Sequence, residues 1–285
     1  MNWFDEGALY AQISTFLRED LGRGDITSQA IIARNTRARG RFVAREKMIV
    51  AGLEAAEEVF LTLDPQQQLE AFVSDGEAVE AGKVIARTSG FADVLIAGER
   101  VALNLIQRLS GVATITSQFV QAVAGTQAQI IDTRETTPGM RLLERYAVVL
   151  GGGRNSRFGL DDGVVITTNH AAVSGGIAAC VKNAREQVGN FHKIQAQVGN
   201  EAEAKEAASN GADGLLLENL EPEAVERLCA VAREIAPAIT VECAGNGLTL
   251  ENVRAYAEAG ATLIGISTSN SCVRAVGVSF QLQPF

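Results

Sequence analysis

The second half of the chain repeats one pattern, in which a short apolar run is followed by a stretch with helical spacing. The apolar runs recur every ~20 to 35 residues, which leaves room for one crossover helix each, and this β-α alternation predicts a parallel sheet. The predicted strands are residues 128–133, 163–168, 191–198, 214–218, 239–244 and 262–267. Spacing alone leaves an open sheet and an α/β barrel as alternatives.

The first part of the chain has a different pattern. Leu9, Ile13 and Leu17 recur at helical spacing and predict an opening helix that ends before Gly22. Between residues 38 and 90, short alternating segments separated by glycines are typical of a small sheet with tight turns. A long helix over residues 92–124, interrupted near Gly111, is expected to connect this α+β domain to the α/β part.

Charge and composition exclude several classes of protein. A net charge of -9 disfavours nucleic acid and anionic membranes as partners. No segment approaches the roughly 20 apolar residues that cross a bilayer, and the acidic Asp5 and Glu6 argue against a signal peptide. The four cysteines lack Cys-x-x-Cys spacing, so we expect neither a disulfide framework nor a zinc site. These features predict a cytoplasmic protein.

In both parallel architectures, ligands bind where the strands end, because loops and helix amino termini converge there. This rule selects polar residues without any motif. The selected positions are Arg134, Thr168, Asn169, Gln197, Glu218, Asn219, 245–247 and 267–269. Glu218 stands out, since a carboxylate at a strand end suits hydrated magnesium or ribose hydroxyls.

Two loops carry arginines that suit an anion. Arg134 lies between a predicted strand and a helix expected to begin near Pro138, where hydroxyls and a guanidinium suit a carboxylate or phosphate. A plain capping loop, with Thr137 as the cap, is the alternative. The glycine-rich turn 151–153 precedes Arg154 and Arg157, and its amides can approach an anion closely. Those glycines also serve simply to end the preceding helix.

Two small polar loops follow the last two predicted strands. Gly245 and Asn246 lie in one, and Ser267 begins the other. Many α/β barrels bind phosphate at this position, although each loop alone is also an ordinary turn. His170 and His192 have no metal-ligand spacing, so a structural role is expected for both.

Several separate segments, in the same order, resemble the quinolinate phosphoribosyltransferase family, also called carboxylating nicotinate-nucleotide pyrophosphorylase, a family of NAD biosynthesis. The resemblance runs along nearly the whole chain. It includes the segments EDLGRGDITS (19–28), ERVALN (99–104), LSGVAT (109–114), DTRETTPG (132–139), RFGL (157–160) and TLEN (249–252).

This resemblance implies a fold, an assembly and a reaction. It implies an α/β sandwich domain over residues 1–106, completed by 271–285, and an incomplete α/β barrel over 107–270. It implies a homodimer in which each sandwich closes the partner's barrel. The family joins quinolinate to phosphoribosyl pyrophosphate with Mg2+, releasing carbon dioxide and pyrophosphate and forming nicotinate mononucleotide. Arg100, Arg134 and Arg157 match the arginines that hold the pyridine dicarboxylate, Arg100 reaching in from the neighbouring subunit.

Other positions depart from the family pattern. Glu135 and Thr167 replace lysines and Ser156 replaces a histidine, while Gln195 and Gln197 replace carboxylates. Two lost lysines and one gained glutamate remove about three positive charges at neutral pH. The predicted catalytic residues are Glu135 and Glu218, with Glu218 also the metal ligand. Further predicted substrate-binding residues are Ser156, Thr167, Gln197, Gly245, Asn246 and Ser267.

Three functions remain open from these residues. The first is the family's phosphoribosyl transfer to a pyridine or other aromatic carboxylate. The second is a repurposed enzyme of a specialised biosynthetic pathway, acting on a pyridine carboxylate or nucleotide, in which Glu135 serves as acid or base. The third is a ligand-binding paralogue without catalysis.

Overall fold

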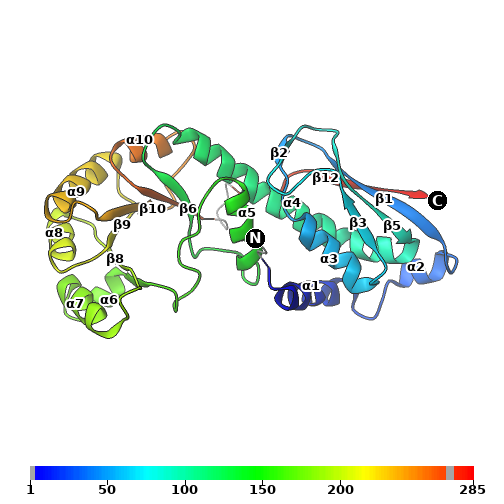
Figure 1. The fold of residues 1–285 in the computed structure, drawn as a ribbon, viewed down its shortest axis with the longest axis horizontal. Helices are drawn as coiled ribbons and strands as arrows, with labels where there is room; N and C mark the ends of the chain where they lie inside the picture. The colour runs from blue at the N-terminus through cyan, green and yellow to red at the C-terminus, as the bar shows by residue number, and fades with distance from the viewer. Residues whose placement is uncertain (1–3, 268–272) are drawn as a thin grey trace. The chain divides into compact units, whose positions relative to one another are not determined.

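The computed structural model describes residues 4–267 and 273–285 and consists of two compact units (Figure 1). The first unit comprises Met1–Ile115, Thr137–Gly151 and Ser271–Phe285, and the second comprises Thr116–Thr136 and Gly152–Asn270. The division falls within helix α4 (Ala92–Ala122), on the carboxyl side of the predicted limit at residue 106. Most of the predicted loop 267–269 lies outside the described residues.

The first unit is built on an antiparallel sheet with the strand order β12-β1-β5-β3. The last strand of the chain pairs with β1 from Ala38↔Pro284 to Ala44↔Val278. Its strands are β1 (Arg37–Ala44), β3 (Gln68–Ala71), β5 (Val84–Phe91) and β12 (Val278–Pro284). A second, two-stranded antiparallel sheet consists of β2 (Met48–Ile49) and β4 (Ala78–Val79). Its helices are α1 (Glu6–Leu21), α2 (Ile26–Ile31), α3 (Leu53–Leu63), the first part of α4, and α5 (Arg141–Leu150).

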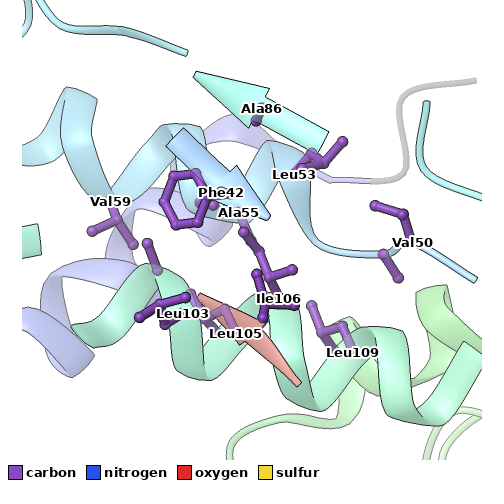
Figure 2. Packing of buried hydrophobic residues seen from close by; sticks show 14 of the residues in the cluster. Phe42, Val50, Leu53, Ala55, Val59, Ala86, Leu103, Leu105, Ile106 and Leu109 are labelled. Carbon is purple, nitrogen blue, oxygen red and sulfur yellow. The ribbon is translucent and has the colours of Figure 1, made fainter. Parts of the chain in front are cut away.

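A single hydrophobic core holds this unit together. Figure 2 shows Phe42 of β1, Val59 of α3 and Ile106 of α4 in the same cluster of buried residues, and all three side chains are fully buried. Strand β1 alternates exposed and buried residues over most of its length, so one face of the sheet packs on the helices. Burying side chains of this size contributes about 1.5–3 kcal/mol each.

The expected interruption of the long helix near Gly111 is wrong, because α4 is continuous from Ala92 to Ala122. A Cβ atom at position 111 would lie 2.1 Å from the carbonyl oxygen of Arg274. The glycine therefore permits close approach of the carboxyl-terminal segment to the helix, rather than a break in it. The side chain of Gln107, one turn earlier, donates a hydrogen bond to the carbonyl of Val278 at 2.9 Å.

The second unit contains a parallel sheet of six strands in which all six predicted strands are confirmed. These strands are β6 (Gln129–Asp132), β7 (Val164–Ile166), β8 (Ile194–Gln197), β9 (Gly214–Glu218), β10 (Thr240–Ala244) and β11 (Leu263–Ile266). Between them lie α6 (Thr168–Val173), α7 (Ile177–Gln187), α8 (Glu201–Ser209), α9 (Pro222–Ile235) and α10 (Val253–Glu258).

The strand order β6-β11-β10-β9-β8-β7 identifies this sheet as an incomplete barrel. Successive strands are neighbours from β7 to β11, and the first strand, β6, lies beside the last. Within the described residues β6 and β7 do not pair, so the ring has one open seam. A single parallel bridge between Ile131 and Arg154 lies along the free edge of β6. The predicted fold class, an incomplete α/β barrel with an α+β sandwich completed by the carboxyl-terminal tail, is confirmed.

Candidate active site

A cavity of about 640 Å³ occupies the interior of the incomplete barrel. Alternate residues of β6, β9, β10 and β11 line it, such as Thr240, Glu242 and Ala244 on β10, and so do Gln195 and Gln197 of β8. Side chains two residues apart share one face of a strand, so these positions point into the barrel. The cavity is therefore the barrel interior, and it contains polar and charged groups.

Two glutamines of β8 each bind a carboxylate across the cavity wall. The side-chain amide of Gln195 donates to Oε2 of Glu242 at 2.7 Å, and that of Gln197 donates to Oε2 of Glu218 at 2.6 Å. Burial raises the pKa of Glu242, and the nearby charges of Asp132 and Glu218 raise it further, against the opposing effect of the Gln195 hydrogen bond. The carboxyl groups of Glu218 and Glu242 therefore lie near one another in this part of the cavity.

Gly265 on β11 provides the space that Glu242 occupies. A Cβ atom at position 265 would lie 3.0 Å from Oε1 of Glu242 and 2.9 Å from Cγ2 of Thr133. Any side chain there would crowd the carboxylate, so a glycine is needed at this point of the barrel wall.

Arg134 and Arg157 bring positive charge to the cavity, as predicted from sequence. The Arg157 guanidinium donates to the carbonyl of Gly163 at 2.8 Å. Burial lowers the pKa of Arg157, and the neighbouring charge of Arg134 lowers it further. Two guanidiniums that repel one another are stabilised by a bound anion, and carboxylates suit them by bidentate pairing. Arg100 belongs to the first unit, where its side chain is exposed on α4.

Glu135 and Ser267 meet at the end of the barrel where the strands terminate. The Ser267 hydroxyl donates to the backbone carbonyl of Glu135 at 3.3 Å, and the Glu135 amide donates to the Thr133 hydroxyl at 3.3 Å. Both residues line the cavity, and Glu135 is exposed. A fixed backbone therefore carries an accessible carboxylate at the cavity mouth.

Ser156 and Thr167 line the cavity, and each also has a local structural contact. The amide and hydroxyl of Ser156 both donate to Oδ1 of the fully buried Asp132, at 2.7 and 2.8 Å. The Thr167 hydroxyl lies 2.8 Å from Nδ1 of His170 at the start of α6. These bonds order the loop after the glycine turn and the loop after β7. Substrate binding by either side chain stays a prediction.

The Gly245–Asn246 loop is fixed to the loop after β9. Asn219 has a left-handed backbone, with φ of 55°, and its side-chain oxygen accepts the amide of Asn246 at 3.2 Å. Gly245 has φ of 136°, and a Cβ atom there would lie 2.2 Å from that same oxygen. Gly245 is thus required by both backbone conformation and close approach.

The sequence assigned no role to Glu242, although a signal for it was present. Glu242 is a carboxylate inside a predicted strand that is otherwise mainly apolar, and a charge in such a position needs a partner. Arg154, which the sequence placed in an anion-binding loop without assigning it a role in substrate binding, also lines the cavity.

No group of three or more His, Cys, Asp or Glu side chains suited to a metal ion occurs within residues 4–267 and 273–285. Over the same ranges, no helix is both long and apolar enough to span a membrane.

Two family models together match most of the chain. The model described as "Quinolinate phosphoribosyl transferase, N-terminal domain" matches residues 25–110, and the corresponding C-terminal domain matches residues 112–281.

Individual relatives and a solved structure indicate the same family. The chain is 38% identical over 270 residues to a probable nicotinate-nucleotide pyrophosphorylase [carboxylating] of Bacillus subtilis, covering 95% of this chain and 92% of the relative. It is 33% identical over 285 residues to a quinolinate phosphoribosyltransferase [decarboxylating] of Nicotiana glauca, covering 93% of this chain and 80% of the relative. It also superimposes on the nicotinate-nucleotide pyrophosphorylase of Francisella tularensis with a TM-score of 0.90 and 32% identity, over 98% of each chain.

Proposed function

The chain belongs to the quinolinate phosphoribosyltransferase family of enzymes, and from this premise we propose that it transfers the phosphoribosyl group of phosphoribosyl pyrophosphate to quinolinate. The observation that supports the proposal most is the pair Arg134 and Arg157 in the barrel cavity. Two adjacent guanidiniums match the two adjacent carboxylates of a pyridine dicarboxylate.

The proposal includes a homodimer and a cytoplasmic location. A second copy of the chain would bring Arg100, exposed on α4, to the cavity as a third guanidinium. Cys180, Cys229 and Cys243 are free thiols, as suits a reducing compartment.

The proposed reaction forms one bond and breaks another at C1 of the ribose. The ring nitrogen of quinolinate attacks C1 while pyrophosphate departs, and the adjacent carboxylate then leaves as carbon dioxide, a proton taking its place. Positive charge develops on the ribose during the transfer, and carboxylates fixed nearby stabilise it. Glu218, held by Gln197 at 2.6 Å, is placed for this role, and Glu135 lies at the cavity mouth.

The described residues do not fit a magnesium ion held by the protein alone. Oε2 of Glu218 faces the amide of Gln197, whose hydrogen atoms repel a cation, and the described residues contain no cluster of acidic or histidine ligands. In the proposal magnesium arrives with phosphoribosyl pyrophosphate, and Glu218 is its one predicted protein ligand. No step above depends on the ion.

One observation favours a second candidate function. Glu135, Glu218 and Glu242 all line the cavity, where they disfavour the many negative charges of phosphoribosyl pyrophosphate. The second candidate is an enzyme that retains the arginine site but acts on a pyridine carboxylate or nucleotide by another reaction, with Glu135 as acid or base.

Mass spectrometry tests the first function. The protein is incubated with quinolinate, phosphoribosyl pyrophosphate and Mg2+, and nicotinate mononucleotide is measured. Product formation that is lost in Arg134→Gln supports the proposal. A folded protein that binds quinolinate but forms no product contradicts it and favours the second candidate. The variant Glu135→Gln tests the role of Glu135 itself. Loss of turnover indicates that Glu135 acts as an acid or base, whereas unchanged turnover excludes that role.

A further inference from the structure

Arg154 lies at the open seam of the barrel, where it takes the place of a neighbouring strand. Its amide donates to the carbonyl of Ile130 at 2.9 Å, and its own carbonyl accepts the amide of Asp132 at 3.1 Å. These two bonds fix the backbone of residue 154 along the free edge of β6, the edge that does not pair with β7 within the described residues. A residue held in this way has a defined side-chain direction.

That direction is into the cavity. Paired residues of neighbouring strands point to the same face of a sheet, and Arg154 is paired with Ile131. Ile131 lines the cavity together with Gln129, two residues earlier on β6, and Thr133, two residues later and just after the strand. Arg154 itself lines the cavity as well, so the strand register and the cavity surface agree.

The charge of Arg154 is available to a ligand. Lys193, another cation of the cavity wall, lies 3.6 Å from a carboxylate oxygen of Asp213. Within residues 4–267 and 273–285, by contrast, the guanidinium of Arg154 has neither a hydrogen bond nor an ion pair. An exposed guanidinium with free donors, held at the wall of a polar cavity, is suited to bind a carboxylate or a phosphate.

Arg154 also lies at a different depth in the barrel from Arg134. It pairs with residue 131, in the middle of β6, whereas Arg134 follows the carboxyl end of that strand. We infer that Arg154 is a further substrate-binding residue, which enters through the seam and binds an anionic group lying deeper in the barrel than the groups held by Arg134. This inference rests on the proposed function for the identity of the substrates, and the anionic group is a carboxylate or a phosphate.

Calorimetric binding tests the inference without requiring turnover. Wild type, Arg154→Gln and Arg154→Lys are titrated with quinolinate and, separately, with phosphoribosyl pyrophosphate in the presence of Mg2+. Arg227→Gln, which removes an exposed arginine from α9 outside the cavity wall, is the matched control. Circular dichroism and thermal unfolding establish that each variant is folded.

We expect Arg154→Gln to raise the Kd of one ligand about tenfold or more, equivalent to about 1.4 kcal/mol. A change for quinolinate identifies a carboxylate as the bound group, and a change for phosphoribosyl pyrophosphate identifies a phosphate. Arg154→Lys should recover part of the loss, because it keeps the charge but not the bidentate geometry. Affinities equal to those of Arg227→Gln, or a wild type that binds neither ligand, would overturn the inference. Binding without formation of nicotinate mononucleotide counts against the proposed function alone.

Discussion

Gln195 on β8 donates its side-chain amide to Oε2 of Glu242 on β10 at 2.7 Å, so the two residues meet inside the barrel on either side of strand β9. The bond stabilises the ionised form of a carboxyl group whose pKa is otherwise raised by burial and by neighbouring carboxylates. It therefore connects the stability of the second unit to pH.

Replacing Gln195 by leucine should destabilise the protein mainly at neutral pH. A raised pKa means that the contribution of Glu242 to stability is fully present below its unfolded value of 4.5 and is lost as the pH rises through the folded value. Without the amide the folded pKa rises further, so the ionised carboxylate costs about 1.5–3 kcal/mol more at pH 7.5. Urea unfolding at pH 7.5 and pH 4 measures the difference. An equal loss of stability at both pH values would contradict this account.

Gly265→Ala should lower the free energy of unfolding by about 1–3 kcal/mol, because the new Cβ atom meets Glu242 and Thr133 within 3.0 Å. Gly247→Ala is the matched control, since a Cβ atom at position 247 would find nothing within 4 Å. Chemical denaturation of both variants gives the comparison. Similar stability in the two variants would contradict this prediction, because it would mean that Glu242 and Thr133 can move away from the new Cβ atom at little cost.

Glu135→Lys should tighten the binding of phosphoribosyl pyrophosphate at least tenfold at low salt, because it exchanges a negative for a positive charge at the cavity mouth. Glu226→Lys, an equal change of charge at an exposed position of α9, controls for the net charge of the protein. Calorimetry at two salt concentrations is the measurement. If the affinity increases equally in both variants, the increase comes from the net charge of the protein and not from the position of Glu135.

Glu144→Ala should destabilise the first unit by about 3–5 kcal/mol, because it leaves the Arg108 guanidinium without its carboxylate. Glu144 is fully buried, lies 2.8 Å from Nη2 of Arg108 and accepts the Thr137 hydroxyl at 2.7 Å. A second change, Arg108→Met, should restore part of the stability by removing the guanidinium that Glu144 binds. Thermal unfolding of the single and double variants checks this, and strictly additive losses would contradict it.

Most of the barrel strands were predictable because they are short, largely apolar runs between polar loops, a pattern typical of the strands of a parallel sheet. Two of the arginines at the site were also predictable, since Arg134 follows a strand and both Arg134 and Arg157 lie in segments resembling one family. Gly111 misled the prediction, because a glycine in a helix has the same sequence pattern whether it breaks the helix or admits another backbone.

The remaining features of the site depend on contacts between distant residues. The Ser156 hydroxyl binds Asp132, which lies 24 positions earlier, and Gln195 binds Glu242, which lies 47 positions later. The direction of the Arg154 side chain follows from one bridge to Ile131 at a seam that no periodicity marks. Such partners become visible only when the strand order is known.

The pairing of β12 with β1 has a consequence for synthesis of the chain on the ribosome. Strand β1 is complete within the first 44 residues, but one of its edges is covered only by Val278–Pro284. During translation that edge stays unpaired while the whole barrel emerges, and unpaired edges promote association with other chains. Residues 278–284 thus protect an edge formed by residues 37–44, and a chain that lacks them would leave this sheet open to aggregation.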